Sequence, residues 1–175
     1  MADTGKASIS VNILPDNIKS RLTGKNNFDI ASALGDLGGN VGDGWIYAEP
    51  TVIYTEADLL GTTEDYLGPK TGAAAVATGD KFRWLVIKHT GTSNGTTKTS
   101  AGVVLCLDAN GSLAYNTGDA IFLAPNNIIV LKTPNTTVAD LHAMTCAVSA
   151  GVPTGATSSG DNVRLIVTGI LRNVA

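Results

Sequence analysis

The side chains that most often perform chemistry are sparse in this sequence, which has two histidines and two cysteines among 175 residues. His142 precedes Cys146 by four positions, so the two could share a neighbourhood in the fold and act as a Cys/His nucleophilic pair. The local signatures of known Cys/His enzymes are absent around them. Cys106 and Cys146 both lie in apolar runs, "VVLCLD" and "AMTCAV", which favours buried free thiols over a disulfide.

The spacing of these residues does not predict a metal centre. A zinc site needs three or four converging ligands, and the sequence contains no HxxxH, HxH or CxxC pattern. His89 closes an apolar run, and we expect it at a strand end, either in solvent or hydrogen-bonded. We therefore expect no catalytic residues, no metal and no cofactor, and the protein is predicted not to be an enzyme.

The carboxylates that stand close together in the sequence are predicted to be solvated turn residues. They form two pairs, Glu56 with Asp58 and Glu64 with Asp65. A glycosidase holds two carboxylates roughly 5–10 Å apart across a cleft, which adjacency in sequence does not provide. Three other aspartates follow a glycine just before a predicted strand, where a carboxylate can bond backbone amides of a turn: Asp80, Asp119 and Asp161.

The glycine-rich stretch "GDLGGNVGDGW" at residues 35–45 resembles a ligand loop only superficially. Its spacing is not GxGxxG, and the Gly-Lys-Ser/Thr of a phosphate-binding Walker loop is absent. One imperfect copy of a calcium-binding nonapeptide cannot supply the stacked ligands of such a site. We interpret the stretch as part of a flexible arm.

Residues 91–100, "GTSNGTTKTS", form a tract of hydroxyls and amides with a single charge. We predict a surface loop between two strands, in which Thr, Ser and Asn satisfy backbone groups without charge. A loop that binds a host surface is the functional alternative. Two tripeptides match the glycosylation pattern but are more simply hydroxyl-rich loops: Asn94-Gly95-Thr96 and Asn135-Thr136-Thr137.

Three aromatic residues near the start of the β-rich region raise a carbohydrate-binding alternative. Trp45, Tyr47 and Tyr54 could form an exposed platform on which sugars stack, although burial in the core is the default for aromatic side chains.

The charge balance argues against nucleic acid and membrane partners. Only 15% of the residues are charged, against about 25% in an average soluble protein. The net charge is -3 without a Lys/Arg cluster, so phosphate neutralisation is not expected. No run approaches the roughly 20 apolar residues of a membrane helix, and "MADTGKASIS" lacks an apolar signal region. We expect synthesis in the cytoplasm.

The elements that must position these residues divide into two regions. Residues 1–44 read as an extended N-terminal arm with two short helical turns, which packs on something else such as a neighbouring subunit. Residues 45–175 contain short apolar runs separated by turn signals, which predict a mainly β fold: an antiparallel sandwich or a jelly-roll/barrel-like domain.

Several local predictions follow from residue patterns within the β-rich region. A strand at residues 51–54 is followed by a helical turn from Thr55. In "KFRWLVIKH", alternation places Phe82, Trp84 and Val86 on one face and the residues between them on the other. Turns are expected at "DANG", residues 108–111, and at Pro125. The closing strand "VRLIVTGIL" has apolar residues on both faces and is predicted to be central.

The C-terminal part, residues 79–175, contains the stretches "GDKFRWLVIKHTGT", "GVVLCLDANGSLAYNTGDAIFLAPNNIIVLKTPNTTVADLHAMT" and "VRLIVTGIL". In these stretches the chain resembles structural proteins of tailed-bacteriophage virions, and capsid decoration (cement) proteins are the most similar class. That resemblance implies a compact β-rich protein, made in the host cytoplasm, that binds the major capsid protein on the outer virion surface. It also implies a homo-oligomer, a trimer or a dimer, which stabilises the shell.

The same residues are compatible with two other classes of function. One is another virion component, such as a tail-tube or head-fibre subunit. The other is a carbohydrate-binding or adhesion module.

Overall fold

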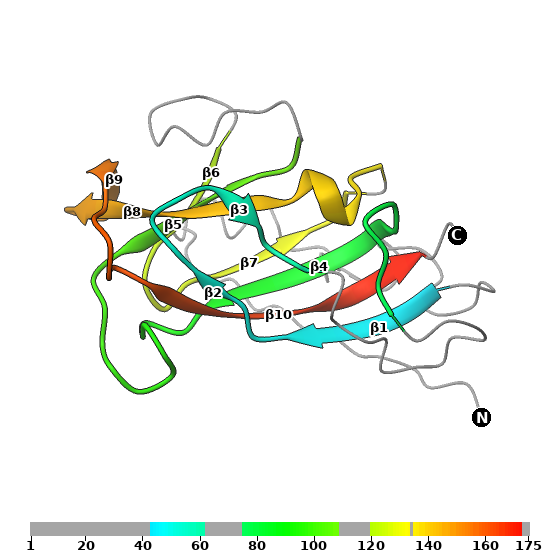
Figure 1. Ribbon diagram of the computed structural model, residues 1–175, viewed down its shortest axis with the longest axis horizontal. Helices are drawn as coiled ribbons and strands as arrows, with labels where there is room; N and C mark the ends of the chain where they lie inside the picture. The colour runs from blue at the N-terminus through cyan, green and yellow to red at the C-terminus, as the bar shows by residue number, and fades with distance from the viewer. Residues whose placement is uncertain (1–42, 62–74, 109–119, 134, 173–175) are drawn as a thin grey trace, which may run out of the picture.

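The computed structural model describes residues 43–61, 75–108, 120–133 and 135–172 (Figure 1). Several predictions fall outside these ranges: the arm up to residue 42 with both helical turns, the pair Glu64 and Asp65, the turn beyond Asp108, and Asp119. Within the described ranges, no helix has the length and apolar content that crossing a bilayer requires.

The described chain forms two antiparallel β-sheets, as its alternating apolar runs predict. The first sheet contains, in spatial order, β1 (Asp43–Ala48), β10 (Val163–Arg172), β4 (Lys81–His89) and β7 (Ile128–Leu131), and β2 (Thr51–Val52) also pairs with β10. The second contains β3 (Ala57–Asp58), β8 (His142–Ser149), β5 (Gly102–Cys106) and β6 (Ile121–Leu123), and β9 (Val152–Ala156) also pairs with β8. A short 3-10 helix, η1 (Val138–Asp140), precedes β8.

The strand order is that of a jelly roll. With β2 and β9 counted as extensions, eight strands lie in the orders β1-β10-β4-β7 and β3-β8-β5-β6, which two Greek keys generate. Figure 1 shows β1, β10 and β4 side by side along the long axis, with β8 and β3 in the upper part of the view. The prediction of a mainly β fold, an antiparallel sandwich or a jelly-roll/barrel-like domain, is confirmed, as is the central position of the last strand.

The main core lies between the sheets because alternate residues of facing strands point inward. β10 contributes Val163, Leu165 and Val167, and β5 contributes Val103 and Leu105, all fully buried in one cluster. A second, smaller cluster lies on the opposite face of β5 and β8. It contains the buried side chains of Val104, Cys106 and Cys146, flanked by the partly buried Phe122 and Met144, among others. The second sheet is therefore apolar on both faces.

The predicted faces of β4 are wrong because the strand contains a β-bulge. Trp84 pairs with Ile170 and Phe82 pairs with Leu171, so Arg83 is the extra residue and the alternation shifts there. Phe82 consequently joins Leu85 in the core, while Trp84 is buried outside that cluster.

The helical turn predicted from Thr55 is also wrong. Ala57 and Asp58 instead form β3, pairing with Ala143 and His142, because cross-strand pairing with β8 outweighs a local capping pattern. The preceding strand is shorter than predicted, since β2 covers only two residues.

The turn predicted at Pro125 is confirmed. The amide N–H of Asn127 donates to the carbonyl of Ala124 at 3.1 Å, and Asn126 has a φ of 66°, which asparagine tolerates better than most residues. The turn carries the chain from β6 in one sheet to β7 in the other.

Candidate functional site

The loop between β4 and β5 is an ordered hairpin rather than an irregular connection. Residues 91–99, here called the hydroxyl hairpin, pair through an antiparallel bridge between Thr92 and Lys98. The Ser93 N–H donates to the Thr97 carbonyl at 2.8 Å, and the Thr99 N–H donates to the Gly91 carbonyl at 3.0 Å. The prediction of an inter-strand loop whose polar residues satisfy backbone groups is confirmed.

Side chains close the tip of the hydroxyl hairpin. The Asn94 Oδ1 atom accepts hydrogen bonds from the backbone N–H groups of Thr96 and Thr97 at 3.0 and 2.8 Å, and from the Thr96 hydroxyl at 3.0 Å. The Gly95 N–H donates to the Thr92 hydroxyl at 3.0 Å, and Gly95 has a φ of 93°, which glycine adopts readily. The tip is thus held in one conformation by short polar side chains.

His89 joins the two ends of the hairpin. Its Nδ1 atom accepts a hydrogen bond from the Gly91 N–H at 2.9 Å, and its Nε2 atom lies 3.0 Å from the carbonyl of Ala101, to which it donates. These partners fix a neutral ring protonated on Nε2. His89 is fully buried, and burial lowers its pKa, which favours the same neutral form. Of the two predicted environments, the hydrogen-bonded one is correct and the solvated one is wrong.

β10 anchors the base of the hairpin. The Arg164 N–H donates to the Thr92 carbonyl at 2.8 Å, and the Arg164 carbonyl accepts from the Thr90 N–H and hydroxyl at 3.2 and 2.7 Å. The tip of the hairpin also lies against the Arg164 side chain, since a Cβ atom on Gly95 would stand 3.8 Å from Arg164 Cδ. The hairpin is therefore fixed to the central strand of the first sheet.

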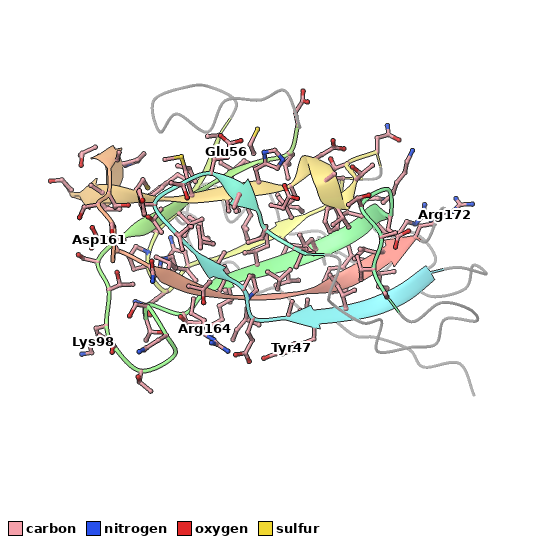
Figure 2. The ribbon with its side chains drawn as sticks, in the orientation of Figure 1. Tyr47, Glu56, Lys98, Asp161, Arg164 and Arg172 are labelled. Carbon is pink, nitrogen blue, oxygen red and sulfur yellow. The ribbon has the colours of Figure 1, made fainter. Side chains whose placement is uncertain are left out.

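The Arg164 side chain belongs to a polar trio with Glu49 and Tyr47. The guanidinium donates to Glu49 Oε2 from Nε at 3.0 Å and also from Nη2. The Tyr47 hydroxyl donates to Glu49 Oε1 at 2.5 Å. Hydrogen bonds from Tyr47 and then from Arg164 lower the pKa of Glu49, and the bond to Glu49 raises the pKa of Tyr47. Figure 2 shows Tyr47, Arg164 and Lys98 along the lower side of the molecule.

Aromatic side chains are expected to be buried in the core, but this expectation is wrong for two of the residues considered for a sugar-stacking platform. Tyr47 is 47% exposed and Tyr54 is 42% exposed, while the side chain of Trp45 lies outside what the structure describes. Tyr47 belongs to β1, whereas Tyr54 follows β2 on the way to β3. The trio joins residues 115 positions apart, so no local sequence signal indicated it.

His142 does not form a pair with Cys146. Its Nδ1 atom lies 2.8 Å from Glu56 Oε1, and its Nε2 atom lies 2.8 Å from the Ala139 carbonyl and 3.3 Å from Asp58 Oδ1. All three partners are acceptors, so a doubly protonated ring satisfies them best. The bond to Glu56 is the main cause of the raised pKa of His142. Glu56 and Asp58 are exposed as predicted, but their association with a residue 86 positions away was not foreseen.

Both cysteines are buried free thiols, as predicted. Cys146 pairs across the strands with Gly102, whereas Cys106 pairs with His142, so the thiols stand four residues apart along the sheet. That separation is about 13 Å at the usual strand rise, far beyond the span of a disulfide. Burial raises the pKa of Cys146 from 9.0 to about 11, which keeps this thiol protonated and a poor nucleophile.

The aspartates predicted to bond turn amides do so where the structure describes them. Asp80 accepts from the Ala77 N–H at 2.9 Å before β4, and Asp161 accepts from the Ser158 N–H at 3.2 Å before β10. Asp140 does the same for Thr137 at 2.8 Å, which the sequence analysis missed. Across the described ranges, no group of three His, Cys, Asp or Glu side chains is arranged to hold a metal ion.

Comparisons with known proteins give no relative. No family model, no curated protein and no solved structure matches this chain. The function must therefore be inferred from the jelly-roll body and its surfaces.

Proposed function

We propose that this protein is a structural component of a tailed-bacteriophage virion, which binds the outer surface of the capsid and stabilises the shell as a decoration protein. The sequence resemblance of residues 79–175 supports this proposal. The jelly roll is compatible with it, since viral capsid domains use this architecture, as do lectins and cupins.

The observation that carries the proposal is an apolar patch at the β7 side of the first sheet. Two cross-strand rows point away from the core, Thr168–Val86–Val130 and Ile166–Lys88–Ile128. Among these six residues only Lys88 is charged, and the Ile128 side chain is 59% exposed. A sheet face in contact with water is normally polar, so this patch is suited to packing against another protein. We call it the β7 patch.

In this proposal the major capsid protein covers the β7 patch. Small contacts repeated over a symmetric lattice give high avidity, especially if the decoration protein is itself a homo-oligomer. The low charge of the whole chain suits such packing, because few ionised groups lose their hydration at the interface.

The test adds purified protein to capsid shells of its own phage, assembled without it, and images them by cryo-electron microscopy. We expect ordered density at repeated positions on the outer surface. Ile128→Asp should abolish this density, because it places a charge in the β7 patch. Val152→Asp is the matched control, since Val152 is 56% exposed but lies on β9 in the other sheet. Bare shells after incubation with the wild-type protein, or equal binding by Ile128→Asp, would contradict the proposal.

The alternative virion roles predict different assemblies. A tail-tube subunit forms stacked rings by itself, which electron microscopy of the purified protein would reveal. A decoration protein should instead give a small closed oligomer, a trimer or a dimer, by light scattering.

A further inference from the structure

Next to the β7 patch, where Tyr47 pairs with Thr168, a second surface lies at the β1 edge of the first sheet. It combines the Tyr47–Glu49–Arg164 trio with the tip of the hydroxyl hairpin, and we call it the trio surface. β1 and β7 are the two ends of the order β1-β10-β4-β7, so β10 and β4 separate Tyr47 from Ile128. Tyr47 and Ile128 can therefore be substituted separately.

The trio is held in a fixed geometry before any ligand arrives. The Tyr47 ring is oriented by the bond from its hydroxyl to Glu49, and the Glu49 carboxylate is held on its other oxygen by Arg164. The Arg164 backbone is in turn bonded to Thr92 of the hairpin. Ligand binding to such a site loses little side-chain entropy, which increases affinity.

The chemistry of the trio surface is polar and close to neutral. The pKa of Glu49 is lowered, so its carboxylate is ionised near neutral pH and is balanced by the guanidinium of Arg164. Unoccupied lone pairs of the carboxylate can accept hydrogen bonds, and guanidinium N–H groups can donate them. The half-exposed Tyr47 ring adds a flat apolar surface beside these groups.

The hydroxyl hairpin adds further donors next to the trio. Asn94 is exposed and uses its side-chain oxygen to close the tip, which leaves its amide N–H groups to donate outward. Thr96, Thr97 and Lys98 are exposed on the same hairpin. The Thr96 hydroxyl already donates to Asn94 and can still accept.

We propose that the trio surface binds a neutral saccharide. A sugar offers a C–H face that stacks on a tyrosine ring and adjacent hydroxyls that pair with a carboxylate and a guanidinium. An anionic ligand is disfavoured by Glu49, and a nucleic acid would need a cluster of cations to neutralise its phosphates. The proposal is independent of capsid binding.

The test measures saturation-transfer NMR between the full-length protein and neutral gluco-, manno- and galacto-oligosaccharides, with a sialylated and a sulfated oligosaccharide for comparison. We expect transfer to at least one neutral oligosaccharide, which is then titrated. Tyr47→Ala should weaken its binding about tenfold, the loss expected for one aromatic contact. Glu49→Gln should also weaken it, because the amide keeps the shape but loses the charge and one acceptor.

Tyr54→Ala is the matched control, because Tyr54 is exposed to a similar degree but is not part of the trio surface. It should bind as the wild type does, and circular dichroism should show that all variants are folded. The proposal is overturned if no neutral oligosaccharide receives transfer, if only the anionic ones do, or if Tyr54→Ala loses as much binding as Tyr47→Ala. Binding by Ile128→Asp at wild-type strength would support two separate surfaces, whichever result the capsid experiment gives.

Discussion

The hydrogen-bond partners of the two histidines favour opposite protonation states. His89 receives a hydrogen bond from an N–H group and donates one to a carbonyl, which requires a neutral ring. His142 faces only acceptors, from Glu56 and Asp58 around β3 and from Ala139 in η1, which favours the charged ring. His142 connects segments 86 positions apart and His89 joins the two ends of one hairpin, so a change of pH acts on the attachment of those segments.

The raised pKa of His142 predicts that stability declines as the pH becomes alkaline. The folded protein holds this proton more tightly than the unfolded chain, whose histidine pKa is about 6.5. The contribution is therefore complete below about pH 6.5 and is lost as the pH rises through the raised value. Denaturant unfolding between pH 6 and 9 should show the decline, and His142→Gln should flatten it.

NMR titration of the ring protons checks both histidines in one sample, because the chain contains no others. The midpoint of His142 should lie above the ordinary value and that of His89 below it. Glu56→Gln should lower the midpoint of His142 and leave that of His89 unchanged. A His142 midpoint at or below 6.5 would contradict the assigned ion pair.

At the scale of elements, the β8–β9 hairpin contains a residue that does not suit its backbone. Ser149 pairs with Val152, so the loop consists of Ala150 and Gly151, which have φ values of 51° and 81°. Such a two-residue turn favours Asn-Gly, because asparagine and glycine accept positive φ. Alanine at the first position is strained, because at positive φ its Cβ atom lies too close to the following carbonyl oxygen.

Replacing Ala150 by Asn should relieve this strain and stabilise the protein by about 0.5–1 kcal/mol. The melting temperature should rise by about 2–4 °C for each kcal/mol. Gly151→Ala, which forces a side chain onto the second positive φ, should lower the melting temperature instead. Differential scanning calorimetry of the two variants and the wild type makes the comparison, and a lower melting temperature for Ala150→Asn would contradict it.

The hairpin also illustrates which elements the sequence could predict. The long strands β4 and β10 are rich in β-branched and aromatic residues, and local pattern suffices to find them. β9 was missed because "VPTGA" contains Pro153 and Gly155, which weaken the strand signal, and it exists through pairing with β8. The bulge at Arg83 was missed because it depends on the register against β10.

The candidate sites were less predictable than the strands, for the same reason. The hydroxyl hairpin could be recognised as a surface loop from its composition alone. The Glu49–Arg164 pair and the Glu56–His142 pair are made by residues 115 and 86 positions apart, and only the strand order brings them together. A single sequence carries no record of such contacts.

At the scale of the whole molecule, the second sheet is apolar on both faces and encloses the two thiols on its outer side. The rate at which the two thiols react with a reagent therefore measures how often this region of the fold opens. A reagent can reach Cys106 and Cys146 only when this region opens.

Reaction with a thiol reagent such as DTNB at pH 8 should accordingly be slow in the native protein. The pKa of Cys146 rises from 9.0 to about 11, which lowers its thiolate fraction about a hundredfold before access is considered. Both thiols should react rapidly in guanidinium chloride. Single Cys106→Ser and Cys146→Ser variants assign the two rates, and fast labelling of native Cys146 would contradict its burial.

β10, the last strand in chain order, occupies the centre of the first sheet, between β1 and β4. During synthesis on the ribosome, β1 and β4 emerge long before the strand that joins them. Until Val163–Arg172 leaves the exit tunnel, core-facing side chains of β1 and β4, such as Ile46 and Leu85, lack their native packing partners. The first sheet can therefore complete its pairing only after β10 has emerged, and until then its unpaired strands are prone to aggregation.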